Sequence, residues 1–169
     1  MGNRTYETVD GISTAYTLDD NDRLLTQGGV TYSYDAQGNT LSQNDNGTLT
    51  SYSYDAKNKL ASVTANGVTT EYGYNHNGTR TAKEQSGTTT NFVVDENRDY
   101  SQVLVELNGT LTEVSYTYGD DLLNQTRAGV SGTYHYDGLG STRALTDASG
   151  NLTDSYDYDA FGIELQSTG

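Results

Sequence analysis

A short motif, Tyr-x-Tyr-Asp-x-x-Gly, recurs along this chain of 169 residues and constrains its fold more than any other feature. Full or nearly full copies lie at 32–38, 52–58, 72–78, 134–140 and 156–162, and looser ones at 16–22, 92–98 and 116–120. The copies that begin at positions 32, 52, 72 and 92 are evenly spaced. Self-similarity at a fixed period is typical of repeat architectures, so we predict a single array of about eight repeats over residues 1–169.

A second series of turn signals alternates with these motifs, and in each of them a glycine follows another turn-forming residue. Its members are Asp10-Gly11, Gly28-Gly29, Asn46-Gly47, Asn66-Gly67, Ser86-Gly87, Asn108-Gly109, Ala128-Gly129 and Ser149-Gly150. Two turns per repeat imply two strands per repeat. Connections this short make consecutive strands antiparallel neighbours.

Each series predicts its own type of turn. The Asp35 carboxylate can accept a hydrogen bond from a backbone amide two residues on, and Gly38 or Asn58 can adopt a positive φ. That combination favours a three-residue hairpin loop built on a type I turn with a bulge. Asn46-Gly47 and Asn66-Gly67 suit a two-residue type I′ turn, in which both residues need a positive φ.

The segments between the turns alternate with a period of two residues. In 68–74 one face carries Val, Thr, Tyr and Tyr, and Tyr34 and Tyr54 are expected on that same face of their own strands. We predict an all-β fold, a long antiparallel meander of β-hairpin repeats with about seventeen short strands, forming a curved or spiralling sheet and a partial shell. On the strands between the tyrosines we expect Leu41, Leu60, Leu107 and Leu145 to share the tyrosine face.

Composition limits the class of protein. Hydrophobic residues make up 33% and the mean hydropathy is −0.72, so a thick aliphatic core is not expected, yet 15 tyrosines and no proline argue against disorder. A formal net charge of −14 disfavours nucleic acid and anionic membrane surfaces as partners. No apolar stretch is long enough for membrane insertion, no signal peptide is visible, and the lack of cysteine excludes disulfides and Cys-based zinc sites.

Several residues have a chemical interpretation beside a structural one. Five aspartates in the turns could act as general acids, but their fixed places favour hairpin closure; these are Asp35, Asp55, Asp95, Asp137 and Asp159. The run 19–22 could bind Ca²⁺, although it lacks the glycine and the terminal glutamate of an EF-hand loop.

The histidines, the segment 141–143 and the tyrosine face also have a chemical and a structural interpretation. His76 and His135 fall in a turn and a strand, outside any metal or triad spacing, and 141–143 is expected to begin a strand rather than to hold a nucleophile. The tyrosine face could stack on sugar rings, but packing is the favoured role.

We therefore expect no catalytic, cofactor or metal residues, only structural ones. The predicted structural residues of the repeat are Tyr32, Tyr34, Asp35, Gly38, Tyr52, Tyr54, Asp55, Tyr72, Tyr74, Gly78, Tyr134, Tyr136, Asp137, Gly140, Tyr156, Tyr158, Asp159 and Gly162.

The repeated Tyr-Asp motif and the block at 134–162 resemble the YD-repeat or Rhs family, which includes bacterial polymorphic toxins, the shell component of ABC toxin complexes and the animal teneurins. The "GNRT" at 2–5 and Gly138-Leu139-Gly140-Ser141-Thr142-Arg143 strengthen the resemblance, which covers the whole chain. The resemblance implies a hairpin repeat that spirals into a hollow shell. In the toxins such a shell encloses a toxic domain, and in the teneurins a related shell serves cell adhesion. Two features depart from the family: Ala160 stands where proline is common, and the self-cleaving segment has no counterpart. We expect an excised or naturally short array, too short to close a shell alone.

Three functions follow as hypotheses. The first is a non-catalytic scaffold, a section of a secreted or surface shell whose partners are flanking repeats or a toxin cargo. The second is an extracellular filament or oligomer, formed through the open edges of the end strands 3–10 and 163–168. The third is a carbohydrate-binding module that uses the tyrosine face. An extracellular or bacterial cell-surface location fits all three.

Overall fold

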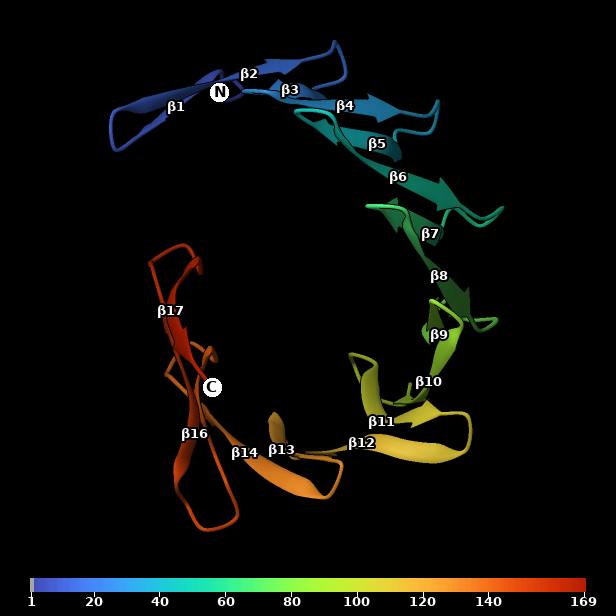
Figure 1. The fold of residues 1–169 in the computed structure, drawn as a ribbon, viewed down its shortest axis with the longest axis vertical. Helices are drawn as coiled ribbons and strands as arrows, with labels where there is room; N and C mark the ends of the chain where they lie inside the picture. Colours follow the sequence, from blue (N-terminus) through green and yellow to red (C-terminus); the bar gives the residue numbers. More distant parts are fainter. Residues whose placement is uncertain (1) are drawn as a thin grey trace. The chain divides into compact units, whose positions relative to one another are not determined.

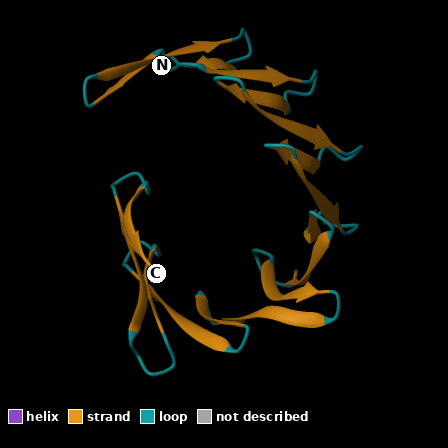
Figure 2. Ribbon diagram, viewed as in Figure 1, coloured by secondary structure: helices purple, strands orange, loops and turns teal. Residues whose placement is uncertain are grey.

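The structure, a computed structural model, describes residues 2–169, and these residues form strands and loops without a helix (Figure 2). The predicted all-β meander of hairpins is confirmed. The strands are β1 (Tyr6–Val9), β2 (Ile12–Leu18), β3 (Leu24–Gln27), β4 (Val30–Tyr34), β5 (Thr40–Asp45), β6 (Thr48–Tyr54), β7 (Leu60–Ala65), β8 (Val68–Tyr74), β9 (Arg80–Gln85), β10 (Thr88–Asp95), β11 (Gln102–Asn108), β12 (Leu111–Tyr118), β13 (Leu122–Arg127), β14 (Val130–Tyr136), β15 (Thr142–Thr146), β16 (Leu152–Tyr158) and β17 (Glu164–Thr168).

The seventeen strands belong to one sheet, and the chain divides into two compact units. The first unit runs up to Gly78 and includes Lys83–Thr88, and the second comprises Thr79–Ala82 and Thr89–Gly169. In the first unit each strand from β1 to β8 pairs antiparallel with the next. In the second, β10 to β17 do the same, and the colours of Figure 1 follow this order within each unit.

The two-residue turns adopt the predicted geometry at most of their positions. Asn46 and Gly47 have φ of 49° and 99°, and Asn66 and Gly67 have 52° and 76°, so type I′ turns are confirmed at both. The same pair of positive φ values occurs at Asp10-Gly11, Ser86-Gly87 and Ala128-Gly129.

Three members of this series differ from the expectation. At Gly28-Gly29 only the first residue has a positive φ in the left-handed region, the pattern of a type II′ turn. Asn108 pairs with Leu111, so the loop there is shifted by one residue and is Gly109-Thr110. Ser149-Gly150 belongs to a loop of the aspartate type, because Asp147 accepts hydrogen bonds from the amides of Ser149 and Asn151.

The core is as thin as the composition predicts. Among the described residues, only Val114 at 0% exposure and Leu145 at 7% are buried hydrophobic residues. Leu145 pairs with Tyr134 and Leu60 with Tyr54, so both lie on the tyrosine face.

The other two leucines predicted for the tyrosine face differ. Leu41 lies at a bulge without a direct partner on β4 and its side chain is 41% exposed, so its place on the tyrosine face stays a prediction. Leu107 was wrongly assigned to this face. It pairs with Asn91, the neighbour of Phe92 on β10, so it lies half-buried on the face opposite to the first-tyrosine position.

The opposite face carries pairs of hydroxyls that bond across neighbouring strands. The oxygens of Ser33 and Ser42 are 2.6 Å apart, and those of Ser53 and Ser62 are 2.7 Å apart. Further pairs are Thr8–Ser13, Thr17–Thr26, Thr64–Thr69 and Ser155–Thr168. Cross-strand Ser/Thr pairs stabilise a sheet without an apolar layer, so this face can stay in contact with water.

The turn at Ala128 gives a test of the backbone argument. Ala128 has φ of 48°, a left-handed conformation that asparagine tolerates better than alanine. Ala128→Asn should therefore raise the free energy of unfolding by about 1 kcal/mol, as measured by urea denaturation. The control Ala144→Gly, within β15, should lower it by about 1 kcal/mol. No gain at Ala128 would contradict the assignment of a strained turn.

Candidate functional site: the aspartate loops and the tyrosine face

The aspartate of each motif holds the loop that follows it. The Asp35 Oδ1 accepts the backbone amides of Gln37 at 2.9 Å and Asn39 at 2.8 Å. The loop is closed by two backbone bonds, from the Asp35 amide to the Asn39 carbonyl and from the Gly38 amide to the Asp35 carbonyl. Gly38 has φ of 94°, so this is the predicted three-residue loop with a type I turn and a positive φ at its third position.

The same arrangement recurs along the chain. Aspartate Oδ1 atoms accept amides two and four residues ahead at Asp19, Asp55, Asp137, Asp147 and Asp159. In the Asp95 loop, Oδ1 accepts the amide of Asn97, and the loop then continues to Ser101 before β11 begins. Asn75 replaces aspartate in one copy and accepts the amide of Asn77.

These bonds decide how the aspartates behave as acids. The Asn39 side-chain amide, together with the backbone amides, holds the pKa of the Asp35 carboxyl below its usual value. The backbone amide of Leu139 does the same for the pKa of Asp137, and the Asn151 side chain for that of Asp147. A carboxylate held in this way stays ionised at neutral pH, so it is badly suited to act as a general acid.

The second tyrosine of the motif makes the contact that joins one repeat to the previous one. In four copies its hydroxyl donates to a backbone carbonyl on the preceding strand, at the residue that begins this strand just after a loop. The bonds run from Tyr34 to Leu24 (2.7 Å), Tyr54 to Thr40 (3.1 Å), Tyr74 to Leu60 (2.9 Å) and Tyr136 to Leu122 (2.6 Å). We call these four contacts the tyrosine–carbonyl bonds.

Each tyrosine–carbonyl bond lies where the backbone pairing stops. The described pairing of β5 with β6 ends at Ser42 opposite Ser51, so Thr40 lies beyond it. The Tyr54 hydroxyl thus supplies a donor to a carbonyl that the strand ladder leaves behind. Burial raises the pKa of Tyr34, Tyr54 and Tyr136, so these hydroxyls remain protonated donors.

First-position tyrosines have other partners. Tyr116 donates to the Glu106 carboxylate at 2.6 Å, and burial together with this carboxylate raises the pKa of Tyr116 to about 12. The rings of Tyr134 and Tyr136 are stacked at 6.3 Å between centroids, and those of Tyr156 and Tyr158 at 6.5 Å. The rings are therefore half-buried in contact with one another, which leaves less of them free for a sugar.

The loops also contact one another through the residue that ends each of them. The Asn39 side chain donates to the Asn58 side chain in the next loop, and Arg23 donates to the Asp35 carbonyl at 3.2 Å. Asn3, in the "GNRT" segment, donates to Asp22. The position after the loop thus joins successive loops. The sequence analysis did not single it out, although its polar side chains were an available signal.

The remaining candidates are engaged in local structure. Asp19 binds Arg23, Asp22 takes the left-handed position with φ of 62°, and no group of three metal-ligating side chains converges within residues 2–169. His76 lies in a loop, and the His135 Nε2 lies 2.9 Å from the Thr146 hydroxyl.

Ser141 ends the Asp137 loop, directly before β15, as predicted for the start of a strand. Arg143 pairs with Asp157 at 2.8 Å.

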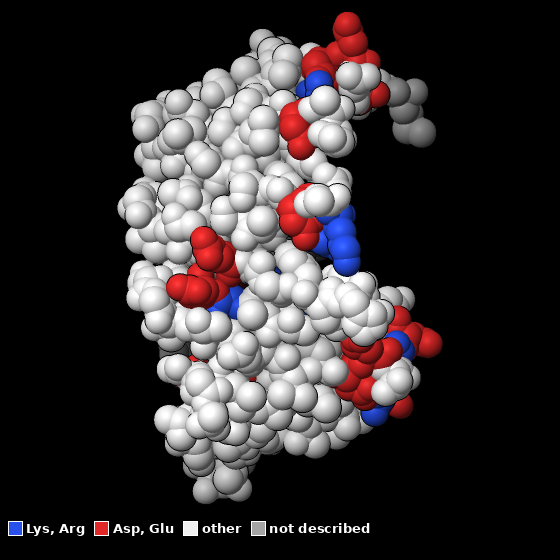
Figure 3. All heavy atoms as spheres, turned by 90° about the vertical axis from the view of Figure 1, so that its right-hand side faces the viewer, with Lys and Arg blue, Asp and Glu red and all other residues white. Residues whose placement is uncertain are grey.

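On the face seen in Figure 3, basic and acidic side chains gather side by side in small groups between large uncharged areas. Residues 2–169 also contain no helix with the length and apolarity to cross a membrane.

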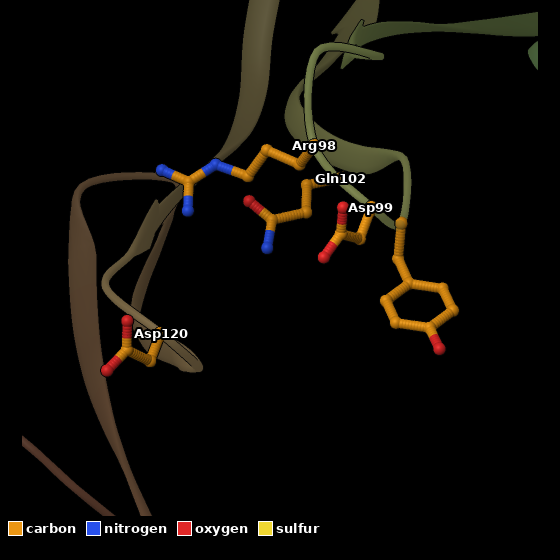
Figure 4. A pocket seen from close by; sticks show the side chains of 5 residues that line it. Arg98, Asp99, Gln102 and Asp120 are labelled. Carbon is orange, nitrogen blue, oxygen red and sulfur yellow. The ribbon is translucent and has the colours of Figure 1, made fainter.

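A shallow polar pocket lies where the repeat is interrupted. It has a volume of about 390 Å³ and is lined by Arg98, Asp99, Tyr100, Gln102 and Asp120. In Figure 4, Asp99 and Gln102 point toward the space between two loops, and Asp120 lies across it. Arg98 donates to the Gly119 carbonyl at 3.3 Å and so bridges the loops, while Tyr100 is 85% exposed. Sequence reasoning missed this pocket, although the extra residues after Asp95 marked it.

The tyrosine–carbonyl bond can be tested on one strand. Tyr136→Phe removes the donor to the Leu122 carbonyl but keeps the stacked ring, so it should lower the free energy of unfolding by about 1 kcal/mol. Tyr134→Phe is the matched control, because the structure gives its hydroxyl no hydrogen bond among residues 2–169, and it should cost less than about 0.5 kcal/mol. Equal losses in chemical denaturation would contradict the role of the bond.

Acid should weaken the aspartate loops. The hydrogen bond from the backbone amide of Arg23 is the main cause that lowers the pKa of Asp19. The ionised Asp19 therefore stabilises the fold above its unfolded pKa near 3.9, and this stabilisation is lost as the pH falls through its folded pKa. Asp19→Asn should therefore reduce the dependence of stability on pH between about 2 and 5, followed by circular dichroism. Asp20→Asn, in the same loop, changes the same charge without touching these bonds and should leave the dependence unchanged. A larger effect at Asp20 would refute the argument.

Comparison with known proteins agrees with this geometry. A family model described as Teneurin YD-shell matches residues 2–169. A 50-residue stretch is 46% identical to the tRNA3(Ser)-specific nuclease WapA of Bacillus spizizenii. The matched stretch covers 28% of this chain and 2% of that protein.

One solved structure shares the fold across most of this chain, and a second matches with a lower score. A crystal structure of TcdB2-TccC3-TEV matches with a TM-score of 0.53 and 15% identity over 96% of this chain and 11% of that one. A Photorhabdus luminescens Tc holotoxin pore matches with a TM-score of 0.46 and 13% identity, over 94% and 12%, and that score supports no conclusion. The chain thus spans a small part of the proteins it matches. The repeats, the hairpin fold and the match across residues 2–169 together show that the chain belongs to the teneurin YD-shell family.

Proposed function

We propose that this chain is a non-catalytic section of a secreted or cell-surface β-shell that surrounds a toxin or other cargo polypeptide. One observation carries the proposal: successive repeats are joined by tyrosine–carbonyl bonds and by contacts between consecutive loops. Such a unit extends by addition of repeats, as nearest-neighbour repeat proteins do. The family membership and the similarity to the TcdB2-TccC3 structure support a wall-building role.

The chemistry of the loops supports the absence of catalysis. The carboxylates that the motif repeats most often are each occupied by two backbone amides. They hold a loop closed rather than face a substrate. The nuclease name of the WapA relative describes that whole protein, and the matched stretch covers only 2% of it.

Flanking repeats are the partners that fit this proposal. In the second unit, β17 pairs with β16 and is exposed along its whole length, so a following repeat could add its first strand there. Self-association through such an edge and sugar binding on the tyrosine face stay predictions. Discrete particles in electron microscopy would exclude filaments, and an absence of binding to a glycan array would exclude the sugar hypothesis.

Enclosure of a cargo predicts protection from protease. In the polypeptide that carries this array with its flanking segments, Tyr34→Phe, Tyr54→Phe and Tyr136→Phe together should loosen the wall, because three hydrogen bonds of about 1 kcal/mol are lost. Trypsin should then cleave the non-repeat segments at least about tenfold faster than in the unaltered polypeptide.

The matched control replaces the first-position tyrosines, Tyr32, Tyr52 and Tyr134, with phenylalanine. This variant loses three hydroxyls as well, but none of the tyrosine–carbonyl bonds. Its protection should remain near that of the unaltered polypeptide. If the non-repeat segments are cleaved rapidly in the unaltered polypeptide, the enclosure proposal is wrong.

A further inference from the structure

The strand β10 lacks both tyrosines of the motif and borders a hollow. Phe92 stands at the first tyrosine position and Val94 at the second. The hollow has a volume of about 330 Å³ and lies within the second unit. It is lined by Thr79, Arg80, Phe92, Val94, Ser101 and Val103.

The period of the repeat shows which side chain this hollow lacks. Tyr54 and Tyr74 lie twenty residues apart, and Val94 follows at the same interval. The carbonyls that these two tyrosines contact belong to Thr40 and Leu60, and Arg80 continues that series. Val94 and Arg80 both line the hollow, so it occupies the place that a tyrosine ring fills in the neighbouring repeats.

The lining suits an aromatic ring. Val94 is directly opposite Val103, and with Phe92 they make an apolar wall. Thr79 and Ser101 also line it. A far smaller apolar cavity, of about 150 Å³ in an engineered protein, binds benzene, so the available volume is sufficient for a phenol.

We propose that this hollow is a binding site for a phenol ring, occupied by a tyrosine side chain of the enclosed polypeptide. The repeat itself indicates a phenol ring, because Val94 stands at the position where the neighbouring repeats place the ring of Tyr54 or Tyr74. The identity of the partner as enclosed cargo rests on the proposed function, whereas the affinity for a phenol does not. Such a site gives the tyrosine face a defined point of contact for another chain.

The first experiment titrates the whole chain with p-cresol and follows the methyl resonances of Val94 and Val103 by NMR. Saturable shifts should appear with a dissociation constant on the order of 1–10 mM. N-acetyl-tyrosinamide should shift the same resonances, because a ring attached to a backbone must be able to enter. An absence of saturable shifts with p-cresol overturns the site, and shifts with p-cresol alone overturn tyrosine as its occupant.

Variants connect the binding to the missing side chain. Val94→Tyr should fill the hollow, remove p-cresol binding and raise the melting temperature, and Val94→Phe should do the same without the hydroxyl. Val93→Tyr is the matched control, since its side chain is 45% exposed on the opposite face of β10, and it should leave p-cresol binding unchanged. Binding that survives in both Val94 variants overturns the assignment.

The outcome is separable from that of the proposed function. If the cargo is protected from trypsin but p-cresol does not bind, only the site is wrong. If p-cresol binds but the cargo is unprotected, the phenol site stands and the enclosed polypeptide as its partner is wrong.

Discussion

The hydrogen bonds that two backbone amides donate to the motif aspartate determine the rest of this structure. By fixing the loop after Asp35, they place Gly38 in the left-handed region and return the chain with a bulge at Leu41. The pairing of β5 with β6 then ends before it reaches this loop, so the Thr40 carbonyl can accept a hydrogen bond from a side chain. The Tyr54 hydroxyl provides that donor, so a local turn in one repeat creates the contact with the next.

This sequence of causes explains why tyrosine, and not leucine, marks the repeat. With Val114 and Leu145 as its buried hydrophobic residues, the described part of the chain cannot rely on a thick core. A tyrosine contributes a large apolar ring to a thin layer and also a hydroxyl that satisfies a half-buried carbonyl. Stability is therefore spread over many equivalent contacts between neighbours, as in other repeat proteins.

The parts of this structure that depend on local rules were predictable from the sequence. Period-two alternation and Asn-Gly or Asp-type turns predict the strands, and the loop at Asp35 follows from residue type alone. Ser149-Gly150 was assigned to the wrong turn because a glycine signals both types, and only the Asp147 carboxylate distinguishes them. The tyrosine–carbonyl bonds were not predicted, since their acceptors are backbone atoms that carry no sequence signal. The bulge at Leu41, which leaves this residue without a direct partner on β4, was not predicted either.

Repeats that keep the full motif leave few polar groups free to bind a ligand. In a regular repeat the aspartate is occupied by amides, the second tyrosine by a carbonyl and the serines of the other face by one another. Few polar groups remain for a ligand there. The segment from Val94 to Val103 interrupts this order: valine replaces tyrosine, the loop after Asp95 is lengthened, and both the polar pocket and the phenol-sized hollow border it. In a shell built from such repeats, departures from the motif leave side chains and space that the regular contacts do not use, so they are positions at which specificity can be sought.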